Sequence, residues 1–429
     1  MKKLVFLKAF FVSLGFGLGL FVNVAFGADA TMDIVKSVQK IPKIEVGYIP
    51  TGESLTAKRA YKVLMGDLNV SGHFEPSDGN AYTKGSIDYG IYQAKKIDLV
   101  AIVEVKKENK AYKATLRLYD INSSNLSINK TYQIADSQLY PFAAHKMAID
   151  INKYIKAPSI DWMSRYVVYS QYTVSGLANI VLSDYTLTYN QTIVSGGLNI
   201  FPKWADSSQK EIYFTRYLPL PTIIRYNIYT GESERLVDSQ GMAAVSDVSK
   251  DGKKLLITLA PRKQTDIYLY DTKSKKLSQM TKYPGIDVSG AFIKNDNEMV
   301  FISDRLGTPN VYSKALNLNA PAQQVVFHGR NNNSVSSFGD YIAYASRESN
   351  NEFGPNIFNI YIISTKSDYI RRLTAVGNNQ MPKFSQDGGS VMFLKHTANS
   401  SAIGVIRLDY NKSFLFPLTN ATGIQSFDW

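Results

Sequence analysis

Five basic side chains recur at similar places in the second half of this sequence. Each follows a short apolar stretch and lies 9 to 14 residues after the apolar anchor of a repeated phrase. They are Arg216, Arg262, Arg305, Arg347 and His396. A guanidinium group can bind a carboxylate through two hydrogen bonds at once, so the pattern predicts contacts with an acidic partner. The alternative is that these side chains are solvated or pair within their own repeat.

Motifs for catalysis or for metal binding are missing from the sequence. The four histidines are far apart, cysteine is absent, and neither a nucleophile elbow nor a phosphate-binding loop occurs. We therefore expect no catalytic residue, no cofactor and no metal. His145 is predicted to be structural, bonding locally within a helix. Trp162, Trp204 and Trp429 are predicted to pack between repeats rather than to bind sugars.

The repeat that positions the basic residues begins after Pro158. The phrase Pro202-Lys203-Trp204-Ala205-Asp206 returns as Pro382-Lys383-Phe384-Ser385-Gln386. The apolar anchors of the copies are Trp204, Val248, Phe292, Phe338, Phe384 and Trp429, at steps of 44 to 46 residues. A step of this size is typical of a four-stranded propeller blade. We predict an all-β six-bladed β-propeller over residues 158–429.

The two ends of the repeat predict how the ring closes. The strand near Tyr166 has no first strand before it, and the strand that ends at Trp429 has no blade after it. We expect the C-terminal strand to complete the first blade, because this pairing removes an exposed edge. The loops between second and third strands then share one rim with the links between blades, so the basic residues would lie on one rim. Link residues predicted near the channel mouth are Met242, Asp287, Asn333 and Asn379.

Residues 28–157 alternate between strand-like and helix-like stretches, which predicts a small α/β domain with a flexible N-terminal segment. One helix is expected to be capped by Ser54 and to end at Gly72, and a second to cover residues 136–155. Strands are expected at residues 43–49, 97–105, 112–119 and 127–134.

The first 27 residues predict a signal peptide. Lys2 and Lys3 precede an apolar stretch, and small residues permit cleavage after Gly27 or Ala30. After Lys8 the apolar stretch is short for a membrane-spanning helix, so export to the periplasm is favoured over an uncleaved anchor helix. The net charge of +12 favours acidic partners.

Several motifs in this order resemble the TolB family, the periplasmic component of the Tol-Pal envelope system. In the first half they are Leu68–Phe74, Ile97–Val103 and Ala144-His145, and in the second half they are the aromatic turns and Ser303–Tyr312. The sequence departs from the family pattern where several turns lack proline and where the Phe338 copy has a shorter turn.

The resemblance implies a binding protein rather than an enzyme. Its propeller would bind the peptidoglycan-associated lipoprotein Pal, and its N-terminal segment would engage the inner-membrane protein TolA. The segment residues expected to do so are Thr31, Met32, Asp33, Ile34 and Val35. The implied role is outer-membrane integrity and invagination during cell division, with other outer-membrane proteins as further candidate partners. We expect a monomer without a membrane span after cleavage and without nucleic acid. The alternative is an extracytoplasmic propeller-type carbohydrate lyase or hydrolase, which would gather histidines or acids around a metal in the central funnel.

Overall fold

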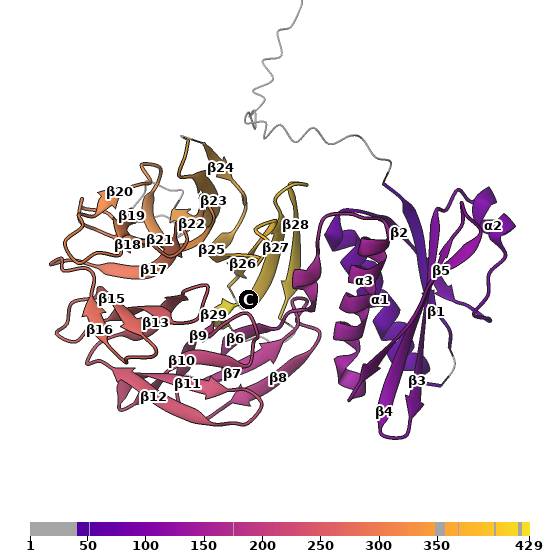
Figure 1. Cartoon of the computed structure of the whole chain (residues 1–429), viewed down its shortest axis with the longest axis horizontal. Coiled ribbons are helices and arrows are strands. Elements are labelled where there is room, and N and C mark those ends of the chain that lie inside the picture. The colour runs from indigo at the N-terminus through magenta and orange to yellow at the C-terminus, as the bar shows by residue number, and fades with distance from the viewer. Residues whose placement is uncertain are drawn as a thin grey trace, which may run out of the picture. The chain divides into compact units, whose positions relative to one another are not determined.

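The computed structural model describes residues 41–50, 52–174, 176–347, 357–367, 369–398, 400–418 and 423–429. These residues all belong to one compact unit. They form a small α/β region followed by six four-stranded sheets arranged as a propeller (Figure 1). The predicted signal peptide and the segment Thr31–Val35 lie outside the described residues.

The α/β region contains one mixed sheet and two long helices. Its strands are β1 (Lys43–Tyr48), β2 (Glu75–Ala81), β3 (Leu99–Glu108), β4 (Ala111–Asp120) and β5 (Asn125–Ile134), in the order β2-β1-β3-β4-β5. Its helices are α1 (Ser54–Ser71), α2 (Tyr89–Ala94) and α3 (Tyr140–Tyr154), with short 3-10 turns at Ser137–Leu139 and Asp161–Ser164. Leu64 and Leu68 of α1 and Met147 and Ile151 of α3 are fully buried in one apolar cluster with the sheet. The 3.6-residue spacing of these side chains explains why both helices pack there.

The ends of α1 show one correct and one wrong prediction. The helix stops at Gly72, whose φ of 77° is the left-handed conformation of a C-terminal cap. Ser54 is not the N-cap, because the cap position is Glu53 and no side chain bonds the first turn. The helix predicted from Asp136 begins later, since the Asp136 carboxylate accepts a hydrogen bond from Gln138 N and starts a 3-10 turn.

Two elements of the α/β region were not predicted. The sequence of β2 is mostly polar, and the strand is an edge strand that pairs in parallel with β1. Such a strand lacks the apolar alternation by which strands are recognised. The short helix α2 has only Tyr92 buried, although Asp88 caps it by accepting a hydrogen bond from Gly90 N.

Each propeller sheet is an antiparallel meander of four strands. The first blade holds β29 (Ile424–Asp428), β6 (Val167–Tyr172), β7 (Ala178–Ser183) and β8 (Asn190–Val194); the second holds β9 (Asn199–Trp204), β10 (Glu211–Leu218), β11 (Leu220–Asn227) and β12 (Ser233–Asp238). The third holds β13 (Ala243–Val248), β14 (Lys254–Leu259), β15 (Asp266–Asp271) and β16 (Leu277–Gln279); the fourth holds β17 (Asp287–Ile293), β18 (Glu298–Ser303), β19 (Asn310–Ala315) and β20 (Gln323–Gln324). The fifth holds β21 (Arg330–Phe338), β22 (Tyr341–Arg347), β23 (Phe358–Ser364) and β24 (Ile370–Arg372); the sixth holds β25 (Asn378–Phe384), β26 (Ser390–His396), β27 (Ser401–Arg407) and β28 (Lys412–Pro417).

The C-terminal strand closes the ring as predicted. β29 pairs antiparallel with β6, with Phe427 opposite Tyr169 and Asp428 opposite Val168. In all six blades the pairing of the first and second strands shifts register once. Such a bulge increases the local twist of a strand, here in the innermost strand of every blade.

Two of the three tryptophans, Trp162 and Trp204, are buried, and Trp429 is half-buried. Trp204 is 5% exposed and joins an apolar cluster with Val168 of the first blade and Phe214 of the second, which confirms its predicted place between blades. Trp162 lies on the 3-10 turn before the propeller rather than at a repeat anchor. Its ring is perpendicular to that of Trp429, with centroids 5.2 Å apart.

Candidate functional site

The two ends of the propeller differ in the loops that they carry. Because neighbouring strands are antiparallel, the loops between second and third strands share one end with the links between blades. We call this end the link face. The opposite end, the turn face, carries the loops between first and second strands and between third and fourth strands.

Exposed apolar side chains concentrate on the link face. The large exposed ones there are Tyr172, Val174, Leu177, Tyr217, Leu220, Ile286, Leu306, Phe327 and Val376. On the described part of the turn face the corresponding residues are Tyr229, Leu277, Leu318, Phe338 and Ile370. Phe327 is 81% exposed, Val376 76% and Leu306 71%. Single exposed apolar residues are ordinary, but a concentration of them on one face is typical of a protein-binding surface.

Basic side chains accompany the apolar ones. Arg262 and Lys263 are exposed in the loop after β14, and Lys282 is exposed in the link before β17. An exposed cation attracts acidic partners over several ångströms and remains free to form a bidentate contact. The link face therefore offers apolar contact area together with positive charge.

Two of the predicted arginines form hydrogen bonds to other residues of the propeller. Arg305 donates to both carboxylate oxygens of Asp287, at 3.1 and 3.0 Å, and Asp287 is fully buried. Arg216 donates to Asn199 Oδ1 at 2.7 Å and to Ser195 O at 3.4 Å. For these two residues the structure matches the alternative, pairing within the fold. Of the five predicted basic residues, Arg262 is exposed and the other four are half-buried.

The remaining predicted residues are divided between the surface and the interior. Asn379 is 1% exposed and donates to Val376 O at 3.1 Å, so it satisfies the carbonyl of its own link. Asn333 donates to Gln380 Oε1 at 2.9 Å and joins two blades. His396 is half-buried with Nδ1 3.4 Å from Ser401 Oγ, and burial lowers its pKa, which makes it a poor cation at neutral pH. Arg347 is half-buried at the end of β22.

A cavity of about 140 Å³ occupies the centre of the ring. It is lined by residues of all six first strands, including the predicted residue Asn333, and by the predicted link residue Met242. Apolar groups such as Phe201 and Met381 form much of the wall, and Lys203 and Lys383 also line it. The lysines are near the C-terminal ends of their strands, close to the turn face.

The lysines belong to a compact group of charges. Lys203 Nζ lies 3.0 Å from Asp428 Oδ1 and 3.2 Å from Asp247 Oδ1. Burial alone would lower the pKa of Lys203, but the two carboxylates outweigh it and raise the pKa above the ordinary value. For Lys383, burial and the neighbouring Lys203 lower the pKa to about 8. Position-by-position comparison of the repeats could have found this group, but the sequence prediction concentrated on the opposite rim.

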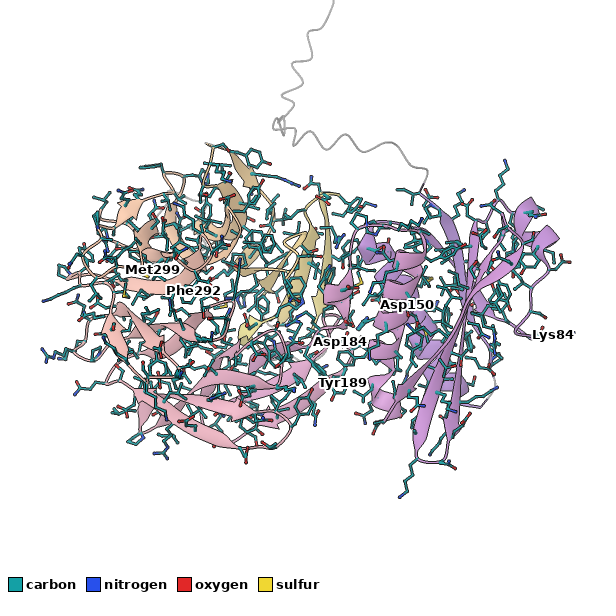
Figure 2. All side chains as sticks on the ribbon, viewed as in Figure 1. Lys84, Asp150, Asp184, Tyr189, Phe292 and Met299 are labelled. Atoms are coloured by element: carbon teal, nitrogen blue, oxygen red, sulfur yellow. The ribbon has the colours of Figure 1, made fainter. Side chains whose placement is uncertain are left out.

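A second buried polar group joins the α/β region to the first blade. His145 on α3 is fully buried, with Nδ1 2.8 Å from Asp67 Oδ2 on α1 and Nε2 3.2 Å from Asp184 Oδ2 after β7. Asp184 also accepts a hydrogen bond from Tyr189 N, and both residues lie on the side of the propeller that is next to the α/β region (Figure 2). The structural role predicted for His145 agrees with this geometry, but its bonds are long-range rather than local.

The described residues include no group of three or more histidines, cysteines or acids that could hold a metal ion. In the same part of the chain, no helix combines the length and apolar character needed to cross a membrane. The described residues that line the cavity include Lys203 and Lys383 but no histidine or acid, the groups that the carbohydrate-enzyme alternative would gather there.

Comparison with known proteins covers nearly the whole chain. The model of the TolB amino-terminal domain matches residues 30–126, and that of the TolB beta propeller domain matches residues 163–427. The Tol-Pal system protein TolB of Wolinella succinogenes is 56% identical over 94% of this chain and 97% of its own length. The corresponding protein of Helicobacter hepaticus is 51% identical over 94% of this chain and 96% of its own length. The crystal structure of TolB from Acinetobacter baumannii has a TM-score of 0.72 at 21% identity, covering 90% of this chain and 97% of that one.

Proposed function

Because this chain belongs to the TolB family of Tol-Pal system proteins, we propose that it is a periplasmic, non-catalytic binding component whose link face binds the peptidoglycan-associated lipoprotein Pal. The observation that carries the proposal is the concentration of exposed apolar side chains on that face. Nine of them, counted over the described residues, lie there beside exposed basic residues. Apolar anchors supply most of the affinity of a protein interface, and charges at its rim steer the partner.

The residues of the link face would have different roles in binding the partner. Phe327 and Leu306 both belong to the link-face end of the fourth blade, at 81% and 71% exposure. They would supply the main apolar contacts with the partner. Arg262 of the third blade would receive a carboxylate of the partner. Arg216 and Arg305 would stabilise the loops, since their guanidinium groups already have partners in the fold.

The proposal extends to the N-terminal segment. After cleavage of the signal peptide, residues 31–35 would engage a TolA-like inner-membrane protein, and the chain would connect the inner membrane to Pal. This connection would support outer-membrane integrity and invagination during cell division. The propeller-type carbohydrate lyase or hydrolase is not favoured, because the domain models that match are those of TolB.

Binding measurements with purified components test the proposal. The mature protein is titrated with the soluble domain of the Pal-like lipoprotein from the same organism, using the variants Phe327→Ser, Leu306→Ser and Arg262→Glu. Each is expected to weaken binding about tenfold or more, the loss typical of an interface anchor. Tyr229→Ser is the control, because Tyr229 is also an exposed aromatic residue but lies on the turn face. Equal affinity in all four variants would contradict the proposed face.

A further inference from the structure

One residue in each blade directly precedes the apolar anchor of the first strand. From the first blade to the sixth, these residues are Asp428, Lys203, Asp247, Ala291, Ser337 and Lys383. We call them the anchor ring. The two acidic members also bond the next blade, since the Asp428 carboxylate accepts from Trp204 N at 3.0 Å and the Asp247 carboxylate accepts from Phe292 N at 2.9 Å. Around the anchor ring acidic and basic residues alternate, except at Ala291 and Ser337.

The interruption leaves Lys383 with fewer partners than Lys203. Lys203 has an acidic neighbour on each side and lies within 3.2 Å of both. Lys383 has Asp428 on one side, at 3.9 Å, which is beyond hydrogen-bond distance, and Ser337 on the other. The Ser337 hydroxyl is already used, because it donates to Phe292 O.

A third cation adds to the imbalance. Arg165 donates to Ser207 O at 3.1 Å and to Gln386 Oε1 at 3.3 Å, and it interacts electrostatically with Asp428. Asp206, on the exposed turn of the second blade, acts on Arg165 from the outside. Within the ring and the adjacent Arg165, three cations thus face the two carboxylates Asp247 and Asp428.

Lys383 borders open space. Its side chain is 22% accessible, and it lines the central cavity. The cavity volume of about 140 Å³ is roughly ten times the 10–15 Å³ needed to admit one water molecule. The pKa of Lys383, lowered to about 8 by burial and by Lys203, reflects an ammonium group that lacks compensation. A negative group in the cavity would supply that compensation.

We propose that the end of the channel formed by the anchor ring binds one carboxylate group, with Lys383 Nζ as the donor that contacts it. A carboxylate suits the site because it accepts a short charge-assisted hydrogen bond from an ammonium group. A small free carboxylate and an acidic side chain of a bound protein share this chemistry. The assignment holds for either source and does not depend on the identity of the partner.

Acetate is the probe for the site. The full mature protein, with lysine labelled by 13C at the ε carbon, is titrated with sodium acetate at constant ionic strength against sodium chloride. The signal that disappears in Lys383→Met identifies Lys383. We expect acetate, and not chloride, to shift this signal saturably and to raise its titration midpoint, because a bound anion favours the ammonium form. No saturable shift in the wild-type protein would overturn the proposal, whatever the folding of the variant.

Calorimetry with variants provides the second readout. Lys383→Met is expected to bind acetate about tenfold more weakly or not at all, the loss expected on removing a charge-assisted hydrogen bond. Lys275→Met removes the same charge from a 68% exposed lysine on the turn face and should bind as the wild type does. Unchanged affinity in Lys383→Met would overturn the proposal. If saturating acetate also weakens the complex with the Pal-like lipoprotein, the natural carboxylate comes from that partner; if it does not, the site serves a free carboxylate.

Discussion

His145 and Asp184 form a buried ion pair between the α/β region and the propeller. The His145 Nε2 atom on α3 lies 3.2 Å from Asp184 Oδ2 in the loop that follows β7, and both side chains are fully buried. Burial alone would lower the pKa of His145, but the Asp67 charge and the hydrogen bonds to both carboxylates raise it to about 9. The imidazolium is therefore the form present at neutral pH, and both ring N–H groups donate.

This pair predicts a loss of stability in alkaline solution. The histidine pKa is higher in the folded state than the 6.5 of an unfolded chain, so its stabilising contribution is complete below about pH 6.5 and is lost as the pH rises through about 9. We expect the free energy of unfolding to fall by on the order of 2 kcal/mol between pH 7 and about pH 9. Urea denaturation at both pH values measures this. His145→Gln should remove most of the dependence; an equal fall in that variant would assign it to other groups.

The pairing of Arg305 with Asp287 predicts strong coupling in a double-mutant cycle. Asp287 is fully buried, so Asp287→Ala leaves a partly buried guanidinium without its partner and should cost about 3 kcal/mol or more. Arg305→Met should cost a similar amount of stability because it leaves the buried Asp287 carboxylate without its ion-pair partner. The double variant should be much less destabilised than the sum of the two, as measured by chemical denaturation. Additive losses would show that the two residues act independently.

Closure by the last strand predicts a large effect of its core residue. Phe427 is 3% exposed and packs in the apolar cluster that the first and sixth blades share with the α/β region. Phe427→Ala should cost about 3–5 kcal/mol, the range for a buried phenylalanine. Leu415→Ala on the outer strand of the sixth blade, at 46% exposure, is the control and should cost under about 1 kcal/mol. Thermal unfolding compares the two, and a small effect at Phe427 would argue against closure by this strand.

One glycine inside α1 and the glycine that caps its C-terminal end predict opposite effects of the same substitution. Gly66 is inside the helix, and an added Cβ would meet no atom within 4 Å, so Gly66→Ala should stabilise by about 0.5–1 kcal/mol. Gly72 has φ +77°, and a Cβ there would meet the Tyr410 ring at 3.1 Å. Gly72→Ala should therefore destabilise by about 1–2 kcal/mol through backbone strain, plus the cost of moving the ring. Stability changes of the same sign would contradict this account of the helix end.

The sequence was sufficient to predict the propeller for a specific physical reason. Each blade places an apolar anchor at the same strand position, so the period is visible at Trp204 and Phe384 without any knowledge of contacts. The charges of the anchor ring could have been found in the same way, since each lies one residue before an anchor. The edge strand β2 could not, because its exposed polar residues carry no periodic pattern.

Partners of buried polar residues were harder to predict than elements. His145 takes its carboxylates from residues 78 and 39 positions away, on a helix and on a propeller loop. Arg305 follows a second strand as predicted, but whether it faces solvent or Asp287 depends on side-chain geometry that spacing does not contain. The same limit applies to Asn379, whose buried amide bonds the link of its own blade.

Site-specific photo-crosslinking in intact cells tests the central claim that the link face is the partner-binding surface. A benzophenone amino acid replaces Phe327 on the link face or Tyr229 on the turn face, two aromatic residues that are 81% and 68% exposed. We predict that the probe at position 327 crosslinks to the peptidoglycan-associated lipoprotein and that the probe at position 229 does not. Crosslinking of the lipoprotein at position 229 alone would contradict the account.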